Sequence, residues 1–242
     1  MRLCLVHGFT QTGASWEPVA RTLRARGHDV VTPDVAGHGR ASAARVDAWG
    51  AARLLAAEVG DAVWVGYSMG GRIALHLALA HPGVVERLVL VSTTAGIRDT
   101  GERASRRAHD EALADDLERD GVAAFVERWL DGPLWASLPR ERAGVEHRLA
   151  NTPGGLASSL RLAGTGAQEP LWARLGEITA PVLVVTGAED AKFSALGKEL
   201  VAALPDASLV VLPGAGHAVP WEQPDAFVDA VDGWLRQSRS PQ

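Results

Sequence analysis

The segment whose residue types could most plainly do chemistry is Gly66-Tyr67-Ser68-Met69-Gly70, a Gly-x-Ser-x-Gly pentapeptide. An apolar run precedes it and a helix-forming run follows it, so we expect the serine at a sharp turn between a strand and a helix. The two glycines allow that turn and hold the Ser68 hydroxyl above the sheet edge. Ser68 is therefore the candidate nucleophile or base. The alternative for a pentapeptide of common residues is a plain small-residue turn.

Two loops further along the chain carry groups that could activate this serine. The apolar run at residues 181–186 leads into Glu189 and Asp190, and the run at 208–212 leads into His217. In open α/β sheets such loops meet at the carboxyl ends of the strands, and the chain order serine, acid, histidine is typical of this kind of site. An imidazole accepts the serine proton, and a buried carboxylate fixes its tautomer. Asp190 is favoured because it lies deeper in its turn, with Glu189 left open.

An anionic intermediate at Ser68 would also need hydrogen-bond donors. The backbone N–H of Met69, directly after the serine, is one candidate. The backbone N–H of Phe9, just past the first apolar run, is the other. Both would belong to an oxyanion hole.

The composition is that of an ordinary globular domain. The chain has 242 residues, of which 47% are hydrophobic, and a net charge of −5 without a polybasic run, which argues against nucleic acid as a partner. Its single cysteine, Cys4, lies in an apolar run and is expected to be a buried thiol. We expect no membrane span, no signal peptide, no metal site and no cofactor, with the cytoplasm as the default compartment. The oligomeric state stays open between monomer and homodimer.

Apolar runs alternate with helical patterns along most of the chain, which predicts an α/β fold with a mostly parallel, doubly wound sheet. The expected strands are residues 3–6, 28–32, 62–66, 88–92, 181–186 and 208–212. The expected helices are residues 16–26, 47–59, 72–81, 196–204 and 224–237.

The alternation stops between about residues 95 and 175, where the chain is rich in Arg, Glu and Ala. We interpret residues 96–175 as a helical cap (lid) insertion over the sheet edge, and residues 1–95 and 176–242 as the core. The helical candidates of the cap are residues 101–119, 121–130, 140–150 and 155–163.

These motifs together resemble the α/β-hydrolase superfamily over almost the whole chain. The resemblance rests on Leu5-Val6-His7-Gly8-Phe9, Asp34-Val35-Ala36-Gly37-His38-Gly39, the Ser68 turn, Asp190 and Gly216-His217. It implies an α/β-hydrolase fold. The first two strands usual in the superfamily have no counterpart here, so a shortened N-terminal sheet edge is expected.

A narrower resemblance is to the bacterial 2-succinyl-6-hydroxy-2,4-cyclohexadiene-1-carboxylate (SHCHC) synthases of menaquinone biosynthesis. It is carried by Gly66-Tyr67-Ser68-Met69-Gly70-Gly71-Arg72, by residues 101–107, 128–138 and 148–151, and by residues 187–193. It implies a lyase that eliminates pyruvate, with Ser68, His217 and Asp190 as the proton-abstracting unit and a small anionic substrate. It also implies that the substrate is bound by Tyr67, Arg72, Arg106, Trp129 and Arg148. The chain has Leu130 where that family often has a tyrosine.

Elementary electrostatics gives independent weight to one of these arginines. Arg72 falls one helical turn beyond Ser68, near the positive end of the helix dipole, where a cation is disfavoured unless an anion binds beside it. For Arg106 and Arg148, surface ion pairing is an equal alternative, since Glu102 and Arg106 are spaced i, i+4. Two other functions are also open. The first is a carboxylic ester hydrolase that forms an acyl-enzyme on a small acidic ester, and the second is a ligand receptor that retains a hydrolase pocket.

Overall fold

The core is a six-stranded parallel sheet in a computed structural model, of which residues 1–237 are described. The strand order is β2-β1-β3-β4-β5-β6, and every neighbouring pair is parallel. The strands are β1 (Arg2–Val6), β2 (Asp29–Val31), β3 (Ala62–Tyr67), β4 (Val85–Val91), β5 (Val182–Gly187) and β6 (Ala207–Leu212). This order confirms the doubly wound α/β architecture.

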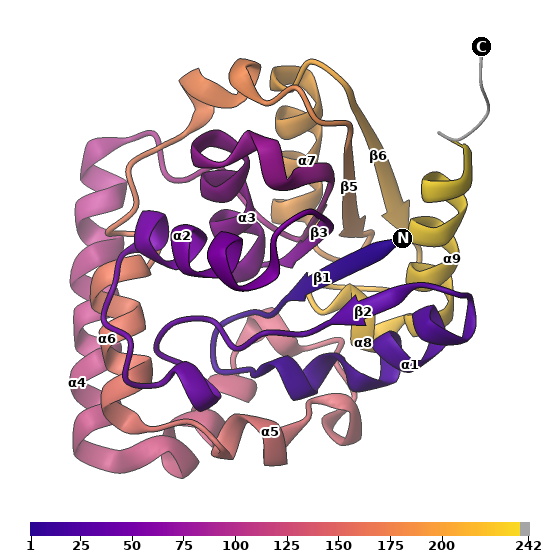
Figure 1. The fold of residues 1–242 in the computed structure, drawn as a ribbon. Helices are drawn as coiled ribbons and strands as arrows, with labels where there is room; N and C mark the ends of the chain where they lie inside the picture. Colours follow the sequence, from indigo (N-terminus) through magenta and orange to yellow (C-terminus); the bar gives the residue numbers. More distant parts are fainter. Residues whose placement is uncertain (238–242) are drawn as a thin grey trace.

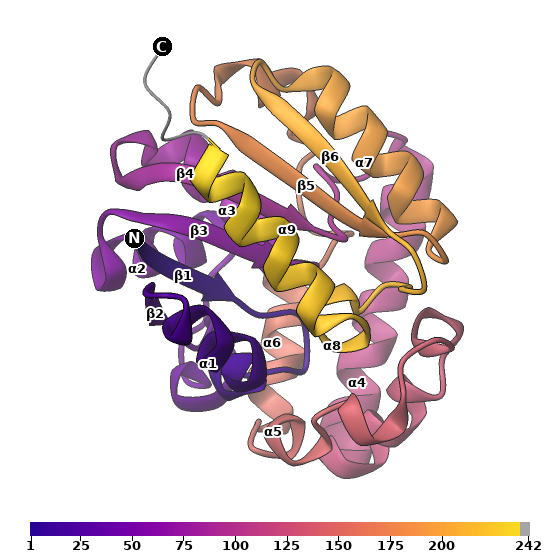
Figure 2. The same ribbon diagram turned by 90° about the vertical axis from the view of Figure 1, so that its right-hand side faces the viewer.

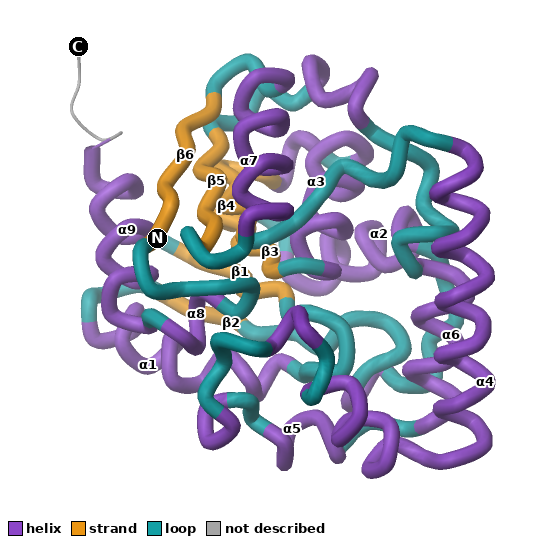
Figure 3. The backbone as a smooth tube through the Cα atoms, turned by 180° about the vertical axis from the view of Figure 1, so that it is seen from behind, coloured by secondary structure: helices purple, strands orange, loops and turns teal. Residues whose placement is uncertain are grey.

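Helices cover both faces of the sheet (Figures 1 and 2). Alternate residues of a strand point to opposite faces, so Leu3 and Leu5 join one buried cluster while Cys4 and Val6 join the other. One face carries α1 (Glu17–Ala25) and α9 (Pro224–Gln237), and the other carries α2 (Ala48–Val59), α3 (Met69–Ala80) and α7 (Ala191–Ala203). Seen from behind, the strands lie together between these helices (Figure 3).

Residues 96–175, the cap segment, contain no strand in the structure and lie along one end of the sheet. Their helices are α4 (Thr100–Leu130), α5 (Val145–Leu149) and α6 (Pro153–Ala163). Long α4 runs beside α6, and Arg161 on α6 pairs with three acidic side chains of α4. The two helices expected at 101–119 and 121–130 are continuous apart from a break at Gly121, whose φ of 81° is non-helical.

Two helices of the core begin earlier than the sequence pattern predicts, and both come soon after a strand. α3 starts at Met69 rather than at residue 72, so the helix begins on the residue after Ser68. α7 starts at Ala191 rather than at residue 196, because the Asp190 carboxylate accepts the Phe193 N–H at 3.1 Å and caps the first turn. Ser68 and Asp190, at the carboxyl edge of the sheet, are therefore the residues that directly precede α3 and α7. In the cap, the helix expected at 140–150 shortens to α5 because Gly144 has a left-handed φ of 61°.

None of the helices within residues 1–237 combines the length and the apolar character that a membrane span requires. Cys4 is buried and unpaired in β1, and burial raises the pKa of its thiol.

Candidate active site

The turn that carries Ser68 is held in a conformation that serine rarely adopts, with φ 52° and ψ −109°. The crossing chains leave no space for side chains at the flanking glycines. A Cβ on Gly66 would lie 2.5 Å from the Gly70 oxygen, and one on Gly70 would lie 2.2 Å from a β1 carbonyl. The Ser68 N–H donates to the Val91 oxygen at 2.8 Å, and the Thr93 hydroxyl donates to the Ser68 oxygen at 2.7 Å. Sheet and turn together fix the serine above the edge.

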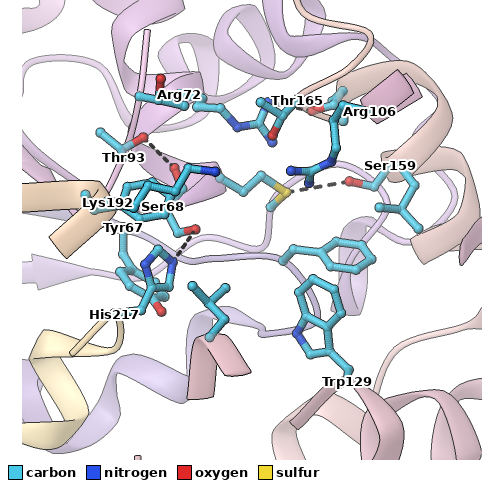
Figure 4. A pocket seen from close by; sticks show the side chains of 18 of the residues that line it. Tyr67, Ser68, Arg72, Thr93, Arg106, Trp129, Ser159, Thr165, Lys192 and His217 are labelled. Carbon is cyan, nitrogen blue, oxygen red and sulfur yellow. Dashed lines mark hydrogen bonds between the residues drawn. The ribbon is translucent and has the colours of Figure 1, made fainter. Parts of the chain in front are cut away.

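Ser68, His217 and Asp190 form a continuous hydrogen-bonded chain (Figure 4 draws its serine–histidine bond). The Ser68 Oγ lies 3.1 Å from His217 Nε2, and His217 Nδ1 lies 2.9 Å from an Asp190 carboxylate oxygen. A carboxylate accepts hydrogen bonds, so Nδ1 carries the proton and Nε2 is free to take that of the serine. Glu189 is exposed, and the hydrogen bond to His217 Nδ1 is made by Asp190. The structure thus places Asp190 beside the imidazole.

A buried carboxylate that the sequence analysis missed fixes the loop around His217. Glu222, at the end of α8 (Val219–Glu222), accepts the Gly216 N–H at 2.7 Å and the Ala218 N–H at 2.8 Å, one on each oxygen. These are the residues on either side of His217. The sequence shows an acid five residues after His217. It does not show that the intervening turn brings the Glu222 carboxylate back to the backbone on either side of the histidine.

The loop after β1 presents the Phe9 backbone N–H, and His7 sets its orientation. Val35 N–H donates to His7 Nε2 at 2.9 Å, so the His7 proton sits on Nδ1 and is donated to the Gly8 oxygen at 2.9 Å. That oxygen and the Phe9 N–H belong to one planar peptide unit and point in opposite directions. Burial lowers the pKa of His7 to about 4, so the ring is neutral. Within residues 1–237 neither Phe9 N–H nor Met69 N–H, the first of α3, has a protein acceptor.

These groups open onto a cavity of about 180 Å³ between the carboxyl edge of the sheet and the cap segment. Ser68 and His217 line the core side, and the cap contributes apolar surface, including Trp129 (Figure 4). Trp129 lies edge-on to Phe9, with ring centroids 5.5 Å apart. Its Nε1 and the hydroxyl of buried Tyr67, which also lines the cavity, have no hydrogen-bond partner among residues 1–237. The cavity therefore has an aromatic wall, to which Phe9 contributes from the core and Trp129 from the cap.

Arg72 brings a positive charge to this cavity and forms no ion pair within residues 1–237, although Asp110 lies near enough to act on its charge. The side chain is 6% exposed, and its Nη1 donates to the Ala163 oxygen at 2.8 Å and to Gln168 Oε1 at 3.0 Å. Both acceptors are neutral. Burial, aided by neighbouring Arg106, lowers the pKa of Arg72 to about 10, which still leaves it charged at neutral pH. A buried cation without a counter-ion is costly, so an anion in the cavity would stabilise it.

Two further cations face the same space (Figure 4). Arg106 reaches in from α4, and Asp110, one turn along, accepts its Nε–H at 2.8 Å and steadies the side chain. Lys192 reaches in from the first turn of α7 and forms no ion pair within the described chain. The sequence analysis missed Lys192 because it placed the helix start at residue 196. A lysine in a first helical turn is the same electrostatic signal that singled out Arg72.

Arg148 differs from the expectation, because its guanidinium does not line the cavity. It is 1% exposed, and its nitrogens point at the Ala143 oxygen, at 2.8 Å, and at the Thr10 hydroxyl. Of the three arginines singled out by resemblance, Arg72 and Arg106 meet at the cavity. Arg148 is directed instead at the loop that carries Phe9.

With this geometry in view, we compared the chain with known proteins. The sequence model of the alpha/beta hydrolase family matches residues 5–230. The chain belongs to the alpha/beta hydrolase family.

Among members of this family, several relatives share a name. A Bacillus subtilis (strain 168) protein named as a candidate SHCHC synthase is 38% identical over 96% of this chain and 89% of its own length. An SHCHC synthase from Salmonella heidelberg (strain SL476) is 30% identical, covering 97% of this chain and 93% of that protein. The structure of MenH from S. aureus has a TM-score of 0.92 at 30% identity, covering 99% of this chain and 95% of that one. A thermophilic esterase from Thermogutta terrifontis has a TM-score of 0.84 at 24% identity, covering 99% and 91%, and shares the fold.

We predict that Glu222→Gln slows the reaction of Ser68 with a neutral organophosphonate by about 10-fold or more. An amide can accept one of the two N–H groups but turns its NH₂ toward the other, so the His217 loop shifts and the serine–histidine bond loosens. The rate of covalent labelling measures this. Glu169→Gln, an exposed acid in the cap, is the control and should label like the wild type. Equal rates for both variants would remove Glu222 from the positioning of His217.

We also predict that the protein loses stability as the pH falls from about 6.5 to 4. Burial lowers the pKa of His7 to about 4, of His38 to about 3 and of His76 to about 4, whereas in the unfolded chain each is near 6.5. Between these values the unfolded chain binds more protons, so the free energy of unfolding falls with pH, by up to about 1.4 kcal/mol per pH unit for each histidine.

Urea unfolding at several pH values between 7 and 4 measures this slope. His7→Gln should make the slope shallower by about one proton, while His109→Gln, a change at an exposed histidine, should leave it unchanged. An unchanged slope in His7→Gln would contradict the neutral state assigned to His7.

Proposed function

We propose that this protein is a lyase of menaquinone biosynthesis. It would eliminate pyruvate from 2-succinyl-5-enolpyruvyl-6-hydroxy-3-cyclohexene-1-carboxylate to give SHCHC. The relatives named as SHCHC synthases support this reaction, and they match nearly the full length of the chain. The observation that supports the proposal is the buried guanidinium of Arg72, which faces the cavity beside Ser68, has neutral hydrogen-bond acceptors and forms no ion pair within residues 1–237.

The charges of the cavity match the substrate. The proposed substrate bears three carboxylates, and Arg72, Arg106 and Lys192 are three cations around one space. Charge-assisted hydrogen bonds to carboxylates are about twice as strong as neutral ones, especially away from water. A neutral ester would offer no charge to these cations, and of the three only Arg106 has an ion-pair partner within the described residues, Asp110. We therefore assign the three carboxylates to these cations, with Lys192 in the place that resemblance gave to Arg148.

The first step would be removal of the ring proton next to the succinyl carbonyl. His217 Nε2 draws the proton from the Ser68 Oγ, which in turn takes the substrate proton, so the base ends as an imidazolium. Asp190 favours that charge from the far side of the ring. No bond forms between the serine and the substrate. The electrons left by the proton move onto the carbonyl oxygen as an enolate.

The second step would be collapse of that enolate. The Phe9 and Met69 N–H groups would hold its oxygen, and each donor of this kind is worth about 3 to 4 kcal/mol of transition-state stabilisation. As the carbonyl re-forms, the ring double bond shifts and the carbon–oxygen bond to the enolpyruvyl group breaks. The leaving enolpyruvate takes the proton back from His217 and tautomerises to pyruvate.

The second candidate is a carboxylic ester hydrolase, and one observation favours it. Ser68 Oγ at 3.1 Å from an imidazole with a buried acid behind it is also the geometry of a nucleophile. The same donors would then hold a tetrahedral oxyanion, and water would release the acyl group. The two functions differ in their product.

We predict that the purified protein releases pyruvate from the enolpyruvyl substrate and that Ser68→Ala lowers kcat by at least about 10³-fold. The fold should survive, since a single hydroxyl at the sheet edge is lost. A coupled assay for pyruvate measures the rate, and Ser105→Ala on the exposed face of α4 is the control. No pyruvate release, with hydrolysis of a short neutral ester at a kcat/KM near 10⁴ M⁻¹s⁻¹, roughly the low end of the enzyme range, would establish the esterase instead.

We predict that Arg72→Gln and Lys192→Gln each lower kcat/KM for the tricarboxylate by about 10-fold or more, because each removes one charge-assisted bond. Neither should change the rate at which a neutral organophosphonate labels Ser68, since that reagent has no carboxylate. Lys198→Gln, a change at an exposed lysine on the same helix, is the matched control. A Lys192→Gln enzyme that behaves like Lys198→Gln would exclude Lys192 as an anchor.

A further inference from the structure

The turn that presents the Phe9 N–H is strained at its next residue. Thr10 is fully buried and has a φ of 67°, a left-handed conformation that a β-branched residue rarely adopts. Such a conformation persists when the surroundings hold it. Within its own loop, the Gly8 N–H donates to Gln11 Oε1 at 3.0 Å and the Gln11 N–H donates to the Gly8 oxygen at 3.2 Å. These two bonds join Gly8 to Gln11 and so close the turn within its own loop.

The other side of the turn is held by the cap segment, through Arg148 on α5. Its Nη1 donates to the Thr10 hydroxyl and lies 3.5 Å from the Phe9 oxygen, while its Nε donates to the Ala143 oxygen at 2.8 Å. The guanidinium also sits over the ring of Trp135, 5.4 Å from its centre, and that ring lines the cavity. Arg148 thus joins two backbone segments and a cavity wall.

Asn151, just past α5, makes a second connection to the same turn. Its side-chain Nδ2 donates to the Thr10 oxygen at 2.7 Å and to the Arg148 oxygen at 3.0 Å. Its Oδ1 accepts the Gly39 N–H at 2.8 Å. Every polar atom of this side chain is therefore engaged, and the hydroxyl and the carbonyl oxygen of Thr10 are both bonded to the cap.

The charge of Arg148 indicates that these contacts serve more than packing. Burial lowers the pKa of its guanidinium to about 10, and within residues 1–237 no carboxylate pairs with it. Neutral acceptors compensate a buried cation poorly, so the arrangement costs stability. In contrast to Arg72, Arg148 does not face the cavity, so a substrate carboxylate is not the compensating group in this arrangement.

We propose that Arg148 and Asn151 are positioning residues through which the cap segment holds the strained Phe9–Thr10 turn, so that the Phe9 N–H faces the cavity as an oxyanion donor. This inference rests on the oxyanion hole of the proposed function. The cap then does more than enclose the substrate, because one of the two donors depends on its docking. Loss of Arg148 lowers the rate with any substrate that develops an oxyanion, whether or not the substrate is charged.

Covalent labelling of Ser68 by a neutral organophosphonate, bearing fluoride as the leaving group, tests this without the natural substrate. The Ser68 Oγ–P bond forms as fluoride leaves, the serine proton passes to His217, and the phosphoryl oxygen needs the donors. We expect Arg148→Met and Thr10→Val to slow labelling by about 10-fold or more, since loss of one donor costs 10²- to 10³-fold. The Arg148→Met/Thr10→Val double variant should be no slower than either single variant, because all three variants lose the same hydrogen bond between Arg148 and the Thr10 hydroxyl.

Three controls separate positioning from other roles. Thr10→Ser keeps the hydroxyl and should label at close to the wild-type rate. Arg128→Met, the same change at an exposed arginine of the cap segment, should also label normally. Thermal unfolding shows whether the Arg148→Met variant folds. If it does not fold, the Thr10→Val variant, which removes one hydroxyl and keeps the branched shape, is used for the labelling test.

The inference is overturned if Arg148→Met and Thr10→Val label at the wild-type rate, or if their effects on labelling multiply in the double variant. A higher KM for the tricarboxylate with unchanged labelling would make Arg148 a carboxylate anchor instead. Absence of pyruvate release in the wild type, with labelling slowed as expected in the variants, would contradict the lyase and leave this inference standing.

Discussion

The close crossing of β3 and α3 at Ser68 is the constraint on which the rest of the site depends. Gly66 and Gly70 have neighbouring backbone atoms where side chains would be, so the strand and helix meet with no space between them. As a result Ser68 adopts a strained φ of 52°. Hydrogen bonds to the Val91 oxygen of β4 and from the Thr93 hydroxyl hold it in this conformation. This single turn places the Ser68 hydroxyl above the carboxyl edge of the sheet. It also leaves the Met69 N–H without a helical acceptor and directs the start of α3 toward the cavity.

Two buried arginines show how the same side chain acquires different roles. Arg72 and Arg148 are both almost inaccessible, burial lowers the pKa of each to about 10, and their bonding partners are neutral. Arg72 lies at the wall of an anion-sized space, so an incoming carboxylate can complete its coordination. Arg148 instead donates to the Ala143 backbone oxygen within the cap and to the hydroxyl of Thr10, in the loop next to that space. Neighbouring acceptors, rather than burial or charge, decide between the two.

Much of this could be predicted from the sequence, and the failures have physical causes. The parallel sheet and the placement of Ser68 and His217 at its edge follow from apolar runs and the loops after them, because parallel strands place their carboxyl ends together. Lys192 was missed because the start of α7 is set by the Asp190 side chain, which caps its first turn, and apolar periodicity does not reveal such a start. The direction of Arg148 depends on Thr10, 138 residues away in the chain, and no local pattern carries such a contact.

The hydrogen-bonded chain of Ser68, His217 and Asp190 suits both hydrolysis and elimination, so the choice between the two reactions depends on where a substrate is held. Attack by a serine requires a carbonyl carbon within bonding reach of Oγ, whereas proton abstraction requires a C–H bond there and the carbonyl oxygen at the donors. Cations on α3, α4 and α7 surround the serine and can fix a multiply charged ring from three directions. Two of these helices begin at the ends of sheet strands, and the third belongs to the cap. Core and cap together would therefore decide which substrate atom meets the base, and with it which bond breaks.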